Sequence, residues 1–144
     1  MKVLFDTSSL VGALVESHPS HERCFSWYER GRRGEISAFV CSHSLAELYS
    51  VLSTYPVGPR PSVEGVGEVL GEALSRPFQF IPLTAADYRA VVESQIRLGI
   101  PGGSVYDGLI ARAAEKASAD VLLTLNRADF ERVWPDHGGR IRVP

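Results

Sequence analysis

Carboxylate side chains occur at four points of this sequence where they could share one site. Asp6 directly follows the apolar run Val3-Leu4-Phe5, and the other three acidic residues follow later apolar runs or begin helical stretches: Glu47, Asp107 and Asp129. Carboxylate oxygens are hard ligands that hold Mg²⁺ or Mn²⁺, and a carboxylate can also accept a proton from water. The residue types therefore predict a site for a divalent cation or for acid-base chemistry.

Short apolar runs alternate with helical stretches along the chain. We expect strands at 3–5, 36–41, 78–83, 121–125 and, at an edge, 141–143, and helices after residue 6 and over about 20–33, 42–52, 63–74, 84–96 and 104–117. Parallel neighbouring strands need long crossovers, which the helices supply. We predict a single-domain α/β fold over residues 1–144, with a mainly parallel sheet of about four or five strands flanked by helices. Ligands bind beyond the carboxyl ends of such strands, where the acidic residues would lie.

Length and composition support one globular domain. The chain has 144 residues, of which 44% are hydrophobic, and a net charge of -2. That charge excludes a strongly basic nucleic-acid coat but permits a locally basic groove. No membrane span is expected, and Met1-Lys2 leads into a strand rather than a signal peptide, so we expect a cytoplasmic protein. Cys24 and Cys41 lack metal-ligand spacing and are expected to be free thiols.

Several other chemistries lack support in the sequence. No histidine pair, thiolate pair or HExxH is present, which argues against zinc. His43 stands four residues before Glu47 but has no second histidine to join it, and we interpret it as a surface or supporting residue. No phosphate-binding loop or GxGxxG occurs, so no nucleotide cofactor is expected, and no GxSxG elbow is present.

Each carboxylate also has a simpler structural interpretation. Ser44 to Glu47 and Ser104 to Asp107 fit the capping-box pattern, Asp6 could cap the first helix, and Asp129 could merely be exposed. These interpretations weaken when taken together, because Asp107 lies in an almost wholly apolar stretch. Burying several unpaired carboxylates is costly, so such a group calls for a compensating cation.

The order of these motifs resembles that of the PIN-domain nucleases, and most closely the VapC-type ribonuclease toxins of bacterial toxin-antitoxin pairs. The resemblance spans almost the whole chain and rests on Asp6-Thr7-Ser8, Ser44-x-x-Glu47-Leu48, Tyr106-Asp107-Gly108-Leu109-Ile110-Ala111 and Leu123-Thr124-Leu125-Asn126-x-x-Asp129-Phe130. It implies an endoribonuclease dependent on Mg²⁺ or Mn²⁺, in which a metal-activated water hydrolyses RNA phosphodiester bonds. It also implies a homodimer and a small antitoxin whose C-terminal segment covers the site.

The resemblance assigns roles to particular residues. Asp6, Glu47 and Asp107 would form the acidic core and hold the metal. Some members have Asp at the position of Asn126, so we give the fourth acidic role to Asp129 and a supporting one to Asn126. Hydroxyl groups that help to order the site would come from Thr7, Ser8 and Thr124.

Basic and aromatic residues could bind the RNA. We expect phosphate contacts at the rim of the site from a basic set: Arg32, Arg33, Arg112, Lys116 and Arg127, with Arg132 also flanking the last acidic segment. The simpler interpretation of any one of them is an ordinary solvated surface residue. Tyr55 and Trp134 could stack on a base or cover the antitoxin groove, although an aromatic residue beside a proline more often serves packing.

Two other functions remain open at this stage. In a non-catalytic α/β binding module, either receiver-like or an inactive PIN-like domain, the carboxylates would serve only as helix caps. A phosphatase with an aspartate nucleophile is a third interpretation, but it would need a second aspartate two residues after Asp6, where Ser8 stands.

Overall fold

A computed structural model describes all 144 residues and contains one five-stranded sheet. The central strand β1 (Lys2–Phe5) pairs with β2 (Ser37–Cys41) on one side and with β4 (Val121–Leu123) on the other. Beyond these lie the edge strands β3 (Gln79–Ile81) and β5 (Ile141–Arg142), and every pairing is parallel. The predicted α/β fold with a parallel sheet is confirmed.

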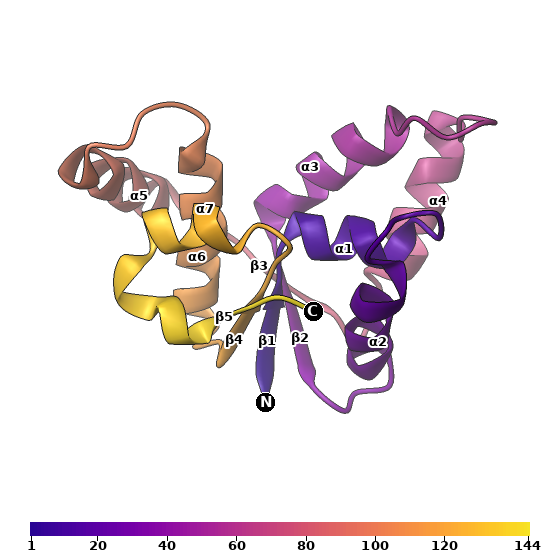
Figure 1. Cartoon of the computed structure of the whole chain (residues 1–144), viewed down its shortest axis with the longest axis horizontal. Helices are drawn as coiled ribbons and strands as arrows, with labels where there is room; N and C mark the ends of the chain where they lie inside the picture. Colours follow the sequence, from indigo (N-terminus) through magenta and orange to yellow (C-terminus); the bar gives the residue numbers. More distant parts are fainter.

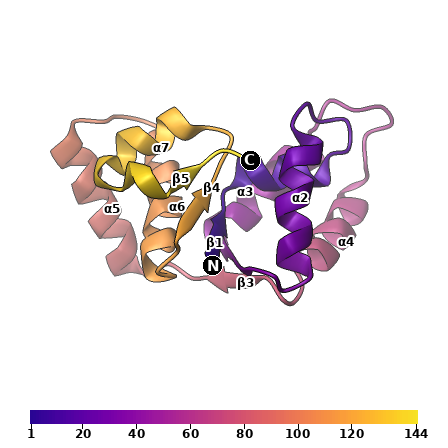
Figure 2. The ribbon, with the colours of Figure 1, turned by 60° about the horizontal axis from the view of Figure 1, so that its bottom comes forward.

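Helices cover both faces of the sheet, as Figures 1 and 2 show. One face carries α1 (Thr7–Leu14), α2 (His21–Arg32), α3 (Ser42–Ser53) and α4 (Val63–Ala73). The other carries α5 (Ala85–Leu98), α6 (Ser104–Lys116) and α7 (Arg127–Val133), followed by a 3-10 segment over Pro135–Arg140. Neither α7 nor the 3-10 segment was predicted, because seven residues are too few to show a helical period.

The sheet separates two apolar cores. Successive side chains of β1 point to opposite faces: Val3 and Phe5 belong to the core under α1 to α4, and Leu4 belongs to the core under α6 and α7. All three side chains are fully buried. This double burial explains why β1 reads as a continuous apolar run rather than an alternating one.

The helix starts differ in part from the capping patterns in the sequence. Asp6 caps α1, where its side chain accepts from the Ser8 N–H, and the Thr84–Asp87 capping box of α5 is formed. The two boxes that would have explained Glu47 and Asp107 are not formed. Helix α3 follows β2 directly, with Cys41 as its N-cap, so it begins before Ser44. Helix α6 has Gly103 as its N-cap, and no side chain forms a capping hydrogen bond there.

An ion-pair cluster around the buried Asp87 fixes α6 against α5. Asp87 accepts from Lys116 Nζ at 2.6 Å and from Arg112 Nε at 3.0 Å, and these bonds together with the capping box hold its pKa well below the usual range. At Gly108 the two helices approach so closely that a Cβ atom would lie 2.8 Å from Val91 Cγ1. These contacts set the position of the first turn of α6, which carries Asp107. No helix is both long and apolar enough to cross a membrane.

Candidate functional site

Asp6 is the most firmly held of the four carboxylates. It lies at the carboxyl end of β1, and only 3% of its surface is exposed. Its Oδ2 accepts hydrogen bonds from Ser8 Oγ at 2.6 Å, from Thr124 Oγ1 at 2.8 Å and from the Ser8 N–H at 3.3 Å. Burial raises the pKa of this carboxyl, and the two hydroxyl groups oppose that rise. Oδ1 takes part in none of these bonds.

The hydroxyl groups around Asp6 are oriented by backbone donors. Ser8 Oγ accepts from the Leu125 N–H at 2.9 Å, and Thr124 Oγ1 accepts from the Asn126 N–H at 2.9 Å. A hydroxyl has a single proton, so each of these groups accepts from the backbone and donates to Asp6. The ends of β1 and β4 are thereby joined, and the orientation of the Asp6 carboxylate is fixed.

Glu47 reaches the same place from α3. Thr7 Oγ1 donates to Glu47 Oε1 at 3.1 Å, and His43 Nε2 lies 3.7 Å from the same oxygen. Burial raises the pKa of Glu47, and the nearby charge of Asp6 raises it further, while Thr7 and His43 lower it. Thr7 therefore connects the carboxylate to the start of α1, directly beside Asp6.

Asp107 shows most clearly that the carboxylates share one environment. Burial raises its pKa to about 7, and the negative charges of Asp6, Asp129 and Glu47 contribute to that rise, in this order. Arg132 on α7 is the cation that opposes it. The four predicted acidic residues thus lie within electrostatic reach of one another at the carboxyl end of the sheet, and we call them the acidic site.

The last acidic segment contributes from the side of α7. Asp129 is exposed in the first turn of α7, and Asn126 precedes that helix and binds Thr124 through its backbone N–H. Arg132 follows Asp129 by three residues, so the two share one side of α7. The sequence showed Arg132 only as a flanking residue, and its proximity to Asp107 depends on the unpredicted helix α7.

The acidic site fits a hard divalent cation by its donor chemistry. Every donor is a carboxylate oxygen, and Asp6 Oδ1 is left out of the hydrogen bonds that hold Oδ2. Burial and then the charges of the three other carboxylates raise the pKa of Asp107, which a bound cation would oppose. No three Asp, Glu, His or Cys side chains lie close enough together in this structure to coordinate one ion. Hydrogen bonds from Ser8 and Thr124 orient Asp6, and a separate hydrogen bond from Thr7 orients Glu47.

Two of the predicted RNA-binding arginines lie away from the acidic site. Arg32 ends α2, at the side of the sheet where β2 begins, and donates to the carbonyl groups of Ser75 and Arg76. Arg33 beside it pairs with Glu29 at 3.1 Å. The strands carry the acidic site at their opposite ends, so the structure does not bring these two arginines to it.

The other predicted RNA-binding residues have structural partners. Arg112 and Lys116 bind Asp87, as described above, and Arg127 pairs with Glu131 at 2.7 Å and donates to the Ile141 carbonyl. Trp134 is buried and donates to Glu115, so it offers no face to a base. Its proposed stacking role is wrong, because the side chain belongs to the core under α7.

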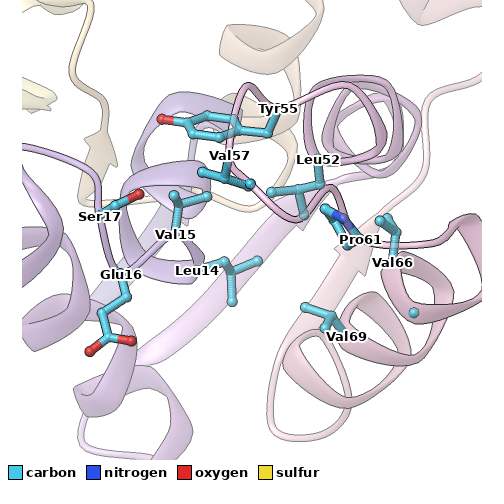
Figure 3. Close-up of a pocket in the computed structure, with 12 residues that line it drawn as sticks. Leu14, Val15, Glu16, Ser17, Leu52, Tyr55, Val57, Pro61, Val66 and Val69 are labelled. Carbon is cyan, nitrogen blue, oxygen red and sulfur yellow. The ribbon is translucent and has the colours of Figure 1, made fainter.

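An apolar hollow of about 540 Å³ lies apart from the acidic site (Figure 3). It is bounded by the ends of α1 and α3, by the loop that connects α3 to α4, and by α4 itself. Leu14, Val15, Leu52 and Val69 face into it, and Tyr55 lies along its rim. Tyr55 therefore lines this hollow, whereas none of the four carboxylates of the acidic site lines it.

The fold and the site define a class of protein: a parallel α/β domain with an acidic centre at the carboxyl ends of its strands. The sequence profile of the PIN domain matches residues 3–134. Ribonuclease VapC27 of Mycobacterium tuberculosis is 31% identical over 116 residues, which cover 81% of this chain and 79% of that protein. Ribonuclease VapC40 of the same organism is 29% identical over 130 residues, covering 89% and 91%.

Solved structures show the same fold. A chain in the crystal structure of VapBC2 from Rickettsia felis, bound to a DNA fragment from the promoter, superposes with a TM-score of 0.69 at 23% identity, covering 99% of this chain and 98% of that one. The chain belongs to the PIN-domain family, among relatives of the VapC type.

Proposed function

We propose that this protein is a metal-dependent endoribonuclease that acts as the toxin of a toxin-antitoxin pair. The observation that carries the proposal is the shared acidic site at the carboxyl ends of the strands, where the buried Asp6 and the hydrogen-bonded Glu47 lie within electrostatic reach of Asp107 and Asp129. The two relatives named above are ribonucleases, which supports RNA as the substrate. The capping interpretation of Glu47 and Asp107 loses its support, because neither residue is in a capping box.

Mg²⁺ or Mn²⁺ would be held by Asp6, Glu47 and Asp107, with Asp129 as the fourth acidic group. When bound, the cation activates a water and offsets charge on the scissile phosphate. The residues of the chain have separate tasks around it. Ser8 and Thr124 keep the Asp6 carboxylate in one orientation, and Thr7 does the same for Glu47.

The remaining steps are proton transfer and charge compensation. Glu47 or Asp129 could accept the proton of the attacking water, since both are carboxylates of the acidic site. Attack at phosphorus breaks the bond to the leaving oxygen, which takes up a proton from solvent, while the carboxylate returns its proton to solvent. Arg132, which already opposes the negative charge at Asp107, would pair with the phosphate as it arrives.

The test is RNA cleavage by two variants. Asp6→Asn and Asp107→Asn should each lower the rate by more than about a hundred-fold, because the loss of an outer partner of a metal site already costs up to that much. Cleavage of a labelled single-stranded RNA would be followed with Mg²⁺ or Mn²⁺ and with EDTA, and EDTA should abolish it.

The matched control is Asp136→Asn, which removes an exposed carboxylate outside the acidic site and should cleave RNA at the wild-type rate. Wild-type cleavage by both site variants, or cleavage that continues in EDTA, would rule out the mechanism.

An antitoxin partner and a homodimer are also part of the proposal. The similar structure from Rickettsia felis is a VapBC complex, which supports a small protein partner, and the apolar hollow of Figure 3 offers a place for its apolar side chains.

Tyr88, Val92 and Ile96 recur every four residues on α5 and are all exposed, which suits a contact with a second copy. We further propose that residues 1–144 act as one domain in the cytoplasm.

A further inference from the structure

An aromatic pair connects two helices beside the acidic site. His43 in the first turn of α3 stacks on Tyr106 in the first turn of α6, with ring centroids 5.1 Å apart and ring planes 7° from parallel. His43 also lies 3.7 Å from Glu47, and Tyr106 directly precedes Asp107. The pair is therefore next to two of the four carboxylates, which belong to different helices.

The two rings differ in exposure. The His43 side chain is 20% exposed, between Tyr106 and Glu47, whereas Tyr106 is 51% exposed. His43 covers one face of the phenol ring, so the exposed surface of Tyr106 consists of its other face and its edge. Its hydroxyl takes part in no hydrogen bond of the structure. The ring is thus held from one side and open on the other.

A supported aromatic ring with one open face is suited to stacking on a flat ligand. Every nucleobase has such a face, and stacking on aromatic side chains is how proteins bind the unpaired bases of single strands. In duplex RNA the bases are stacked on each other, and their faces are not available to a side chain. The position beside Asp107 places a stacked base close to any phosphate that reaches the acidic site.

We propose that the open face of Tyr106 binds a nucleobase adjacent to the scissile phosphate, and that His43 is a positioning residue that holds the Tyr106 ring. This inference rests on the proposed function and makes it more specific, because it names the residue that binds the base next to the cleaved bond. The Tyr106 ring then holds the base, and the carboxylates act on the phosphate.

The test combines a protein variant with a modified RNA. Short single-stranded RNA oligonucleotides of one sequence would be made intact and with an abasic nucleotide at each position in turn. For the wild type, loss of the base next to the cleaved bond should raise KM about ten-fold with little change in kcat, in keeping with base-aromatic stacking. Tyr106→Leu should raise KM for the intact RNA by a similar factor, and the abasic RNA should then show no further loss.

Other variants separate stacking from a structural role. Tyr106→Phe keeps the ring and should keep the abasic effect, and His43→Ala should weaken that effect without removing it. Tyr49→Leu is the matched control, because Tyr49 is 47% exposed on α3 but lies nearly opposite Glu47 around the helix. It should leave KM and the abasic effect unchanged. Thermal unfolding would show whether each variant is folded.

The outcomes distinguish this inference from the proposed function. An unchanged KM for folded Tyr106→Leu, or an abasic effect of full size in that variant, overturns the stacking while leaving the nuclease in place. If the wild type cleaves no RNA, the proposed function fails, and binding of the same labelled RNA measured by fluorescence anisotropy decides the stacking. Equal binding by wild type and Tyr106→Leu, or no binding by either, then overturns it.

Discussion

Asp107 connects burial, charge and protonation at the scale of a single residue. Its pKa is raised to about 7 by burial and by three neighbouring carboxylates, whereas an aspartate in the unfolded chain titrates near 4. Between about pH 4 and 7 the folded protein therefore binds more protons at this residue than the unfolded chain does. The free energy of unfolding should fall as the pH rises through this window.

This behaviour gives a prediction for Asp107→Asn, whose amide is neutral at every pH. In EDTA, the melting temperature of the variant relative to that of the wild type should rise between about pH 4 and 7 and level off at higher pH, because only the wild type gains a disfavoured charge in that window. Thermal unfolding followed by circular dichroism measures the difference.

Two comparisons accompany the measurement. Asp136→Asn should show no such trend, and Mg²⁺ added to the wild type near pH 8 should raise its melting temperature. A melting difference for Asp107→Asn that stays constant with pH would mean that neither burial nor the neighbouring carboxylates raise the pKa of Asp107.

At the scale of elements, the position of the acidic site depends on how closely helices approach. Gly108 stands beside Asp107 on the buried side of α6, where it lies against Val91 and Gln95 of α5. Gly67 in the middle of α4 has no atom within 4 Å of the place of a Cβ. Glycine thus permits a close helix contact at Gly108 in α6, whereas Gly67 in α4 makes no such contact.

Alanine substitutions at these glycines should have opposite effects. Gly108→Ala places a methyl group 2.8 Å from Val91 Cγ1, and the resulting overpacking should lower the free energy of unfolding by about 1–3 kcal/mol. Gly67→Ala should raise it by about 1 kcal/mol, because alanine is the better helix former and meets no obstacle. Urea unfolding of the two variants checks both signs, and a neutral Gly108→Ala would contradict the close approach of α5 and α6.

At the scale of the whole molecule, the apolar stripe of α5 is the feature that suits assembly. Tyr88, Val92 and Ile96 follow one another at a spacing of four residues, and Ile96 is 74% exposed. A continuous apolar strip of this kind favours contact with another protein surface. It belongs to the same half of the molecule as Asp107, as Figure 1 shows for α5 and α6.

The prediction concerns molar mass in solution. The wild type should sediment as a dimer, and Ile96→Glu should shift it towards the monomer, because a charge would be buried unpaired at the contact. Val63→Glu, which changes a 53% exposed apolar residue on α4, should leave the mass unchanged. A wild type that is monomeric at micromolar concentration, or an Ile96→Glu variant that remains dimeric, would exclude this stripe as the dimer contact.

Much of the fold was predictable because its signals are local. The apolar runs gave the strands, the Thr84–Asp87 capping box is formed as expected, and the alternation of strands and helices implied a parallel sheet. The seven-residue helix α7 was not predicted, since it is stabilised by the burial of Phe130 and Val133 rather than by its own pattern. The same limit applies to three of the basic residues, Arg32, Arg112 and Lys116, whose partners are distant in the sequence.

The sequence by itself determined which groups are available for chemistry: four carboxylates, each placed after a strand or at the start of a helix, and hydroxyl residues beside them. Only the tertiary structure decided which charges meet. It paired Arg112 and Lys116 with Asp87, placed Arg32 and Arg33 at the far end of the sheet, and brought Arg132 near Asp107. Electrostatic and stacking contacts act over a few ångströms in space, so the packing of α6 and α7 decides them.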